Sequence, residues 1–297
     1  MAKDSWPQLH SKAIGLKSPN VDHPILTRRF SELSSVSTWK LPLTSGSQVE
    51  QTAEFTMAGP GPIPDRQNKP HPHSAFTDPS GKYLLSADLG ADMIHVFSID
   101  ADSGKLTSCA DVKTGAAEGP RHGAWWVPEA GSTDGTMLYI VNELANTVTV
   151  WQVEYGASCL SMKKTQSLPT YPDGKSAPAG SKASEVRVRD NMLYASNRND
   201  KSFGATEDSV VTYSIDPSSG AITFVEATSA HSYFPRTFEI NKAGDMVAFG
   251  GQTSSTVAIV ARNTTTGRLG DLIASLPVGS PGTVNNEDGL SHLVWLE

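Results

Sequence analysis

The chain has 297 residues with 24 Lys and Arg against 31 Asp and Glu, which gives a formal net charge of −7. This acidic balance, without any block of basic residues, argues against nucleic acid as a partner. No apolar run approaches the roughly 18 residues of a membrane span, and residues 1–18 lack the apolar core of a signal peptide. We therefore expect a cytoplasmic protein that binds no membrane, although a signal segment upstream of residue 1 would reopen that question.

The first 35 residues carry Pro7, Pro19 and Pro24 and no alternating apolar pattern. This composition predicts an irregular leader over 1–35, followed by one domain over 36–297. At the start of that domain, residues 36–41 resemble residues 148–153, so the outer strands of a first repeat unit begin near Val36.

A repeat of about 54 residues runs through the rest of the chain. Its copies start from residues 78, 133, 192 and 242, and each combines apolar, β-branched segments with turn residues. An apolar strand precedes each copy, at residues 74–76, 123–125, 186–188 and 237–240. Four strands in each unit of this length indicate the blade of a β-propeller, and nothing in the chain has the sustained 3.6-residue period of a helical repeat.

The 25 Gly and 19 Pro residues are then expected in the turns between strands. The expected fold is all-β, with four complete four-stranded blades and partial blades at both ends. Downstream of the last full unit, residues 293–295 are predicted to form one more inner strand. The two cysteines, Cys109 and Cys159, form no metal-ligand cluster and predict no disulfide framework, so we expect ordinary half-buried thiols of a reducing compartment.

Two positions of the repeat are predicted to gather at one end of the propeller, because equivalent positions of a blade lie at equivalent radii. The first position precedes the inner strand and holds His73, Arg121, Glu185 and Arg236. The second follows the next strand and holds Leu89, Glu143, Arg198 and Gln252. Seven of these eight side chains are polar. A solvated surface does not require such a set, so the shared register favours a functional cluster over isolated turn residues or a structural Glu143–Arg198 pair.

This residue set limits the chemistry. Arg binds carboxylate or phosphate through two parallel hydrogen bonds, and His or Glu can move a proton. The chain has no nucleophile elbow, no phosphate-binding glycine loop and no zinc-protease motif, and no metal cage is obvious. We therefore expect a small anionic substrate, no cofactor and no metal, with the opening or closing of a lactone as reactions that fit.

At these residues the chain resembles the seven-bladed propeller lactonases, a family that includes bacterial-type 6-phosphogluconolactonase and fungal carboxy-cis,cis-muconate cyclase. The matching stretches lie at residues 71–92, 119–126, 139–151, 193–198 and 234–252, and GPRH at 119–122 with VNEL at 141–144 is the most specific part. The resemblance extends over about residues 36–297.

Carried over residue by residue, the resemblance implies that His73, Arg121, Glu143 and Arg198 form the catalytic and binding set. Arg236, Glu185 and Gln252 join Arg121 and Arg198 as expected substrate-binding residues. His73 or Glu143 would then activate water against the lactone carbonyl, while the arginines hold the substrate anion. Hydrolysis of an anionic lactone such as 6-phosphogluconolactone is the leading hypothesis. The alternatives are the cyclase reaction, a non-catalytic binding propeller, or an inactive shortened relative.

The length of the chain departs from the pattern of this family. Seven blades of about 50 residues need roughly 350. The sequence therefore predicts an incomplete or open ring, or a product shortened at its N-terminus.

Overall fold

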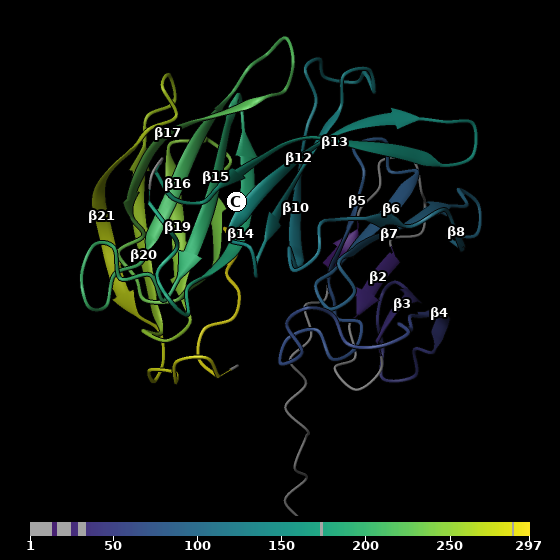
Figure 1. Ribbon diagram of the computed structural model, residues 1–297, viewed down its shortest axis with the longest axis horizontal. Helices are drawn as coiled ribbons and strands as arrows, with labels where there is room; N and C mark the ends of the chain where they lie inside the picture. Colours follow the sequence, from purple (N-terminus) through teal and green to yellow (C-terminus); the bar gives the residue numbers. More distant parts are fainter. Residues whose placement is uncertain (1–13, 17–24, 29–33, 173–174, 287) are drawn as a thin grey trace, which may run out of the picture.

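Five antiparallel sheets make up the chain in a computed structural model that describes all residues except 1–13, 17–24, 29–33, 173–174 and 287. In Figure 1 the two C-terminal sheets lie at the left, the two N-terminal sheets lie at the lower right, and the third sheet lies between them. Among the described residues, no helix has the length and apolar character needed to cross a membrane.

Each sheet takes its strands consecutively from the chain, as a propeller blade does. The first contains β1 (Ile14–Leu16), β2 (Ile25–Arg28), β3 (Ser35–Lys40) and β4 (Val49–Glu54). The second contains β5 (Pro72–Thr77), β6 (Tyr83–Asp88), β7 (Met93–Ile99) and β8 (Leu106–Ser108), with β9 (Val112–Lys113) also paired to β7.

The other three sheets repeat the same four-stranded order. The third contains β10 (Pro120–Trp126), β11 (Met137–Asn142), β12 (Thr147–Tyr155) and β13 (Leu160–Pro169). The fourth contains β14 (Lys182–Arg189), β15 (Met192–Arg198), β16 (Ser209–Ile215) and β17 (Ile222–Ser229). The fifth contains β18 (Pro235–Ile240), β19 (Met246–Gly251), β20 (Thr256–Arg262) and β21 (Leu269–Pro277).

The turn before the outermost strand shows why the repeat folds in this way. Gly104, Gly220 and Gly267 occupy the equivalent turn position in three blades, with φ of 69°, 69° and 70°. These left-handed angles strain any residue with a Cβ atom, and glycine adopts them freely. The turns bring each outer strand back antiparallel to its neighbour.

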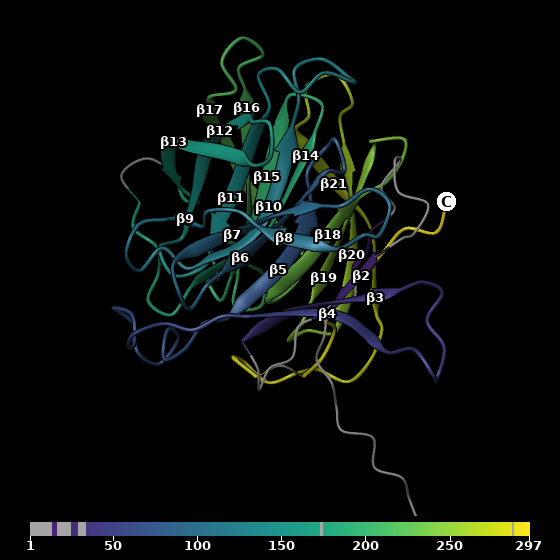
Figure 2. The same cartoon turned by 90° about the vertical axis from the view of Figure 1, so that its right-hand side faces the viewer.

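The core lies between the blades. Tyr139 and Val141 of the third sheet pack with Val186 and Leu193 of the fourth, and similar buried clusters join the other consecutive sheets. Neighbouring inner strands β5, β10, β14 and β18 are in contact along the chain order. Figure 2 shows the same five sheets after a 90° turn about the vertical axis. The charged residues of the inner strands are therefore brought together by blade-to-blade packing.

The all-β propeller prediction is confirmed, and so is the position of the four predicted inner strands. The first sheet is more complete than expected, because β1 and β2 lie within residues 1–35. These two strands differ from the irregular leader expected there, while most of that leader lies outside the described residues. The division of the chain at residue 35 stays a prediction.

Two other expectations were wrong. Residues 293–295 form no strand, although the Trp295 indole donates a hydrogen bond to the Glu239 carbonyl oxygen and so lies against β18. Cys109 and Cys159 are joined in a disulfide. One cysteine follows β8 and the other lies in the β12–β13 hairpin, so residues 50 positions apart meet where the second and third blades pack together. Sequence spacing alone does not reveal that contact.

Candidate functional site

The first polar position of the repeat is a β-bulge in each of four inner strands. Pairing shifts between Pro72 and Ser74 around His73, and the same shift occurs around Arg121 and Arg236. In β14 the shift lies between Ala183 and Val186 and includes Glu185. A bulge puts two residues opposite one and turns their side chains out of the usual alternation. The repeat therefore aims its charged residues by a shared backbone irregularity.

The second polar position has a shared backbone contact. The Glu143 amide donates to the Gly119 carbonyl oxygen at 2.8 Å, and the equivalent Gln252 amide donates to Phe234 at 2.8 Å. Leu89 makes the corresponding bond to His71 at 3.0 Å. Each of these residues is thereby fixed beside the start of the inner strand of its own blade. The predicted register of the two positions is correct.

Glu143 is the centre of the charged cluster. Its side chain is 1% exposed, and it accepts hydrogen bonds from Arg121 Nε at 2.9 Å and from Arg198 Nη2 at 2.6 Å. Arg66 forms a further ion pair with its Oε1 atom. Arg121 also donates to the Ser184 carbonyl oxygen at 2.7 Å, which ties the third blade to the fourth at this point.

The electrostatics of this cluster are dominated by cations. Burial alone would raise the pKa of Glu143, but the charges of Arg198, Arg66 and Arg121 hold that pKa well below its usual range. Burial, followed by the charges of Arg198 and Arg236, holds the pKa of Arg121 well below its usual value. Burial also lowers the pKa of Lys182. An additional anion would be favourable here, because it would compensate charges that Glu143 leaves unbalanced.

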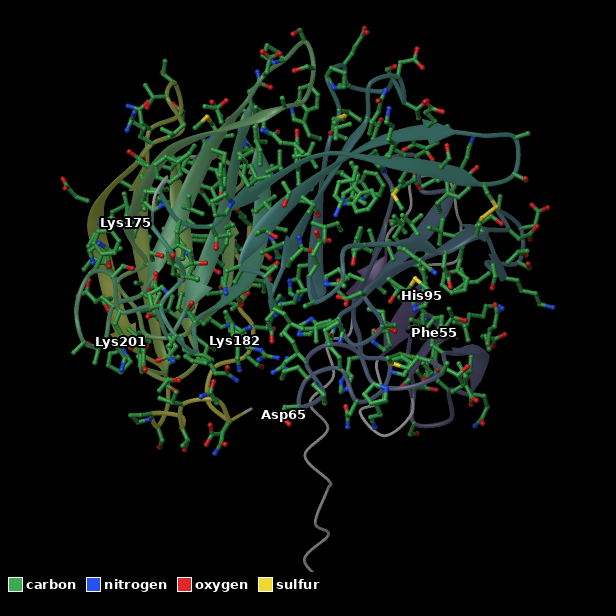
Figure 3. The ribbon with its side chains drawn as sticks, viewed as in Figure 1. Phe55, Asp65, His95, Lys175, Lys182 and Lys201 are labelled. Atoms are coloured by element: carbon green, nitrogen blue, oxygen red, sulfur yellow. A yellow bond between two sulfur atoms is a disulfide. The ribbon has the colours of Figure 1, made fainter. Side chains whose placement is uncertain are left out.

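Arg66 and Lys182 were not predicted from the sequence. Arg66 lies in the connection between β4 and β5. The neighbouring Gln67 donates a hydrogen bond from its side-chain Nε2 to the Leu89 carbonyl oxygen at 3.1 Å, and this holds the loop on the second blade. Lys182 is the first residue of β14 and is labelled just left of centre in Figure 3. Neither residue stands at a repeated polar position, so the register gave no signal for them.

His122 is a third residue that the sequence reasoning missed. Its Nδ1 atom lies 2.5 Å from Glu185 Oε1, and its Nε2 atom lies 3.1 Å from His73 Nδ1. The two imidazole rings have centroids 5.0 Å apart. Simple strand alternation would place His122 on the face opposite Arg121. The bulge brings both residues to the same site, and only the fold reveals that.

Glu185 is fully buried, and its Oε1 atom, which contacts His122, also accepts a hydrogen bond from Arg187 Nη1 at 2.6 Å. Arg187 also forms an ion pair with Glu239 of β18. Although burial opposes it, the charges of Glu185 and Glu239 raise the pKa of Arg187. The predicted substrate-binding residue Glu185 thus contacts a histidine and an arginine of the protein.

Arg198 is linked to two of the remaining predicted residues, Gln252 and Arg236. Its guanidinium carbon lies 5.4 Å from the centroid of the Phe234 ring, whose backbone carbonyl binds Gln252. Gln252 is 1% exposed, and its Oε1 and Nε2 atoms have no hydrogen-bond partner among the described residues. Arg236 is half-buried and close enough to lower the pKa of Arg121 and Arg198. Leu89 is buried and apolar.

In the part of the chain that the structure describes, no group of three or more His, Cys, Asp and Glu side chains is arranged to hold a metal ion. The expectation of a site without metal or cofactor stays a prediction. The side chains that meet here can bind an anion, donate hydrogen bonds to a developing negative charge, and exchange a proton at an imidazole.

Residues 28–286 match the family model described as "Lactonase, 7-bladed beta-propeller". The chain belongs to this lactonase family. It is 36% identical over 215 residues to a protein of Arthroderma benhamiae named probable 6-phosphogluconolactonase, an alignment that covers 72% of this chain and 53% of that relative. It is 26% identical over 236 residues to the 6-phosphogluconolactonase of Bacillus subtilis, covering 80% of this chain and 62% of the relative.

Two solved structures show the same fold. A periplasmic gluconolactonase of Pseudomonas aeruginosa superimposes with a TM-score of 0.70 at 27% identity, covering 90% of this chain and 70% of that one. A protein of Lactobacillus plantarum superimposes with a TM-score of 0.72 at 22% identity, covering 86% and 69%. The chain spans about half the length of the Arthroderma relative.

Proposed function

We propose that this lactonase-family chain hydrolyses an anionic sugar lactone of the 6-phosphogluconolactone type. The observation that carries the proposal is the grouping of Arg66, Arg121 and Arg198 around one buried carboxylate, Glu143, beside the His73–His122 pair. The relatives named as 6-phosphogluconolactonases support the same substrate class.

The proposed reaction needs a base, an anion site and support for the carbonyl oxygen. His73 accepts a proton from water as the water oxygen attacks the lactone carbonyl carbon. Arg121 or Arg198 stabilises the oxyanion that develops there. The ring C–O bond then breaks, and the proton on His73 passes to the leaving ring oxygen. One water is consumed, and the product is the open hydroxy acid.

Glu143 is the weaker candidate for the base. Its carboxylate is surrounded by cations that hold its pKa well below the usual range, so it has little tendency to take a proton. Its role in this proposal is to orient the arginine side chains. An imidazole is better matched to proton transfer near neutral pH.

The side chain of Gln252 is an argument for a substrate that carries hydroxyl groups. Its buried amide carries one acceptor and two donors that have no partner among the described residues. A sugar lactone offers hydroxyl groups to such an amide, whereas a carboxymuconate offers carboxylates and an unsaturated chain. This favours the hydrolase over the cyclase, although the arginines fit both anions.

The test is a comparison of three substrates with the purified chain. We expect 6-phosphogluconolactone to open well above its spontaneous rate, with gluconolactone opening more slowly because it lacks the phosphate. Arg198→Ala should raise KM for the phosphorylated lactone at least tenfold. Conversion of 3-carboxymuconate in place of either lactone would support the cyclase. Failure of a folded sample with all three would support a binding propeller or an inactive relative.

A cytoplasmic location stays a prediction, and the disulfide weighs against it. Disulfides persist in oxidising compartments and are rare in the cytosol. The Cys109–Cys159 bond therefore favours a compartment such as the secretory pathway or the periplasm.

A further inference from the structure

His122 is held by protein groups at both ring nitrogens. Its Nδ1 atom is 2.5 Å from Glu185 Oε1. Its Nε2 atom is 3.1 Å from His73 Nδ1 and 3.3 Å from Arg121 Nη1. His122 is 4% exposed and Glu185 is fully buried, so these contacts lie inside the protein.

These contacts assign the protonation of both imidazoles. A guanidinium nitrogen can only donate, so Arg121 Nη1 requires His122 Nε2 to be the acceptor. His122 then carries its proton on Nδ1 and donates it to Glu185. Because His122 Nε2 accepts, His73 Nδ1 must be the donor in the bond between the two rings. The nitrogen of His73 that can take a proton is therefore Nε2.

The positive charge of the nearby arginines opposes a second proton on His122. Burial, followed by the charges of Arg198 and Arg236, already lowers the pKa of Arg121. A second proton on His122 would add a cation 3.3 Å from Arg121. The ionised or titratable groups that face this region are Arg66 before β5, His73 of β5, Arg121 of β10, Glu143 after β11, Lys182, Glu185 and Arg187 of β14, Arg198 of β15, and Arg236 and Glu239 of β18.

We propose that His122 and Glu185 are positioning residues that fix the tautomer and orientation of His73. This inference rests on the proposed lactonase function, in which His73 Nε2 accepts a proton from the attacking water. As His73 becomes an imidazolium, its Nδ1–H donates more strongly to His122 Nε2, and His122 in turn donates more strongly to the Glu185 carboxylate. Each of these two protons stays on its own nitrogen. The negative charge of Glu185 thus stabilises the His73 cation across the one intervening ring of His122.

Arg187 explains how Glu185 stays in place. It binds Glu185 through Nη1 and Glu239 through Nη2, so one guanidinium spans two carboxylates on neighbouring blades. Of these two carboxylates, Glu185 is the one that contacts His122 Nδ1. Glu239 is 25% exposed and provides a matched control, because it shares the arginine and lies outside the histidine pair.

The kinetic test compares Glu185→Gln with Glu239→Gln on 6-phosphogluconolactone. We expect Glu185→Gln to lower kcat by about tenfold to a hundredfold, with KM within about twofold, because substrate contacts remain. The active form of the base is neutral, so losing the carboxylate that stabilises its cation should move the acidic limb of the kcat–pH profile to lower pH by about one unit. Glu239→Gln should leave kcat and the profile within about twofold and a few tenths of a unit.

A second test does not depend on turnover. Nitrogen NMR of the ring atoms distinguishes the two neutral tautomers, and we expect both His73 and His122 to carry the proton on Nδ1. His122→Phe, which keeps a ring but has no acceptor, should release His73 to populate the Nε2-protonated tautomer. If Glu185→Gln does not fold, this variant and the wild-type spectrum still test the assignment.

The outcomes separate the inference from the function. Hydrolysis by the wild type with an unchanged kcat and pH profile in Glu185→Gln would overturn the positioning role and leave the lactonase proposal standing. Protonation of His73 on Nε2 in the wild type would also overturn it. If the wild type opens no lactone, the proposed function fails, and the positioning role for that reaction fails with it even where the NMR tautomers are as assigned.

Discussion

Glu143 holds three arginine side chains at one point. Arg66 reaches it from the β4–β5 connection, Arg121 from β10 and Arg198 from β15, so three parts of the chain meet at one carboxylate. A buried carboxylate in such surroundings fixes the direction of each guanidinium and leaves an excess of positive charge for a ligand.

Replacement of Glu143 by Gln tests this structural role. It leaves the buried Arg121 and Arg198 without their anion, so the free energy of unfolding should fall by about 3 kcal/mol. Urea unfolding of the variant and of the wild type measures this loss.

Arg66→Gln is the control for Glu143→Gln, because it removes a more exposed member of the same cluster. Its side chain is 38% exposed, so solvent screens its pair with Glu143, and Arg66→Gln should cost no more than about 1 kcal/mol. An equal loss of stability in the two variants would contradict the role assigned to Glu143.

Part of this site could be predicted from the sequence. His73, Arg121, Glu143 and Arg198 could be found because the repeat gives them fixed positions. Arg66 could not, because it lies outside the two repeated polar positions. His122 could not, because the pattern of a regular strand puts neighbouring residues on opposite faces, and a bulge removes that alternation.

Among the strands, β7 carries a second histidine that links neighbouring elements. His95 Nε2 lies 3.2 Å from Asp88 at the end of β6, and its Nδ1 atom lies 3.0 Å from Asp111 just before β9. Phe55, which follows β4, stacks on the His95 ring with centroids 3.7 Å apart (Figure 3). The imidazole therefore ties the first sheet to the second.

This contact predicts a pH-dependent stability. Burial opposes protonation of His95, but the hydrogen bond and charge of Asp88 and the charge of Asp111 raise its pKa above the usual value. The stabilisation is therefore fully present below about pH 6.5, the ordinary pKa of histidine, and is lost as the pH rises through the folded-state value. Urea unfolding of His95→Asn and the wild type should show a larger difference at pH 5.5 than at pH 8.5.

Asp111→Asn is the matched variant, since it keeps the shape of the contact and removes an exposed charge. It should reduce the same pH dependence in part. A destabilisation by His95→Asn that is equal at both pH values would show that the ring acts through packing on Phe55 alone.

For the whole molecule, the packing of successive blades determines both stability and site geometry. The repeat predicted the blade architecture well, because its turn residues and apolar strands recur at a fixed interval. It did not predict that β1 and β2 belong to the first sheet, since those short strands are separated by proline-containing segments without alternation. It also missed the contact of Cys109 with Cys159, which depends on how two blades meet.

The disulfide should contribute measurably to stability. It closes a long loop between two blades, and removal of such a bond typically costs about 2 to 4 kcal/mol. We expect Cys109→Ser, Cys159→Ser and the double variant to lose similar amounts in urea unfolding, because each removes the same bond. The chain contains only these two cysteines, so a reducing agent should reproduce the effect in the wild type and leave the double variant unchanged. Two free thiols in the native protein, purified without reductant, would contradict the bond.

The most direct measurement of the central claim is the rate of 6-phosphogluconolactone opening by the wild type and by His73→Ala, after subtraction of the spontaneous rate. The account predicts enzymatic opening by the wild type and a fall of about a hundredfold or more in kcat for His73→Ala, the scale of one acid–base group. A folded wild type that does not exceed the spontaneous rate, or a His73→Ala variant that keeps the wild-type rate, would contradict it.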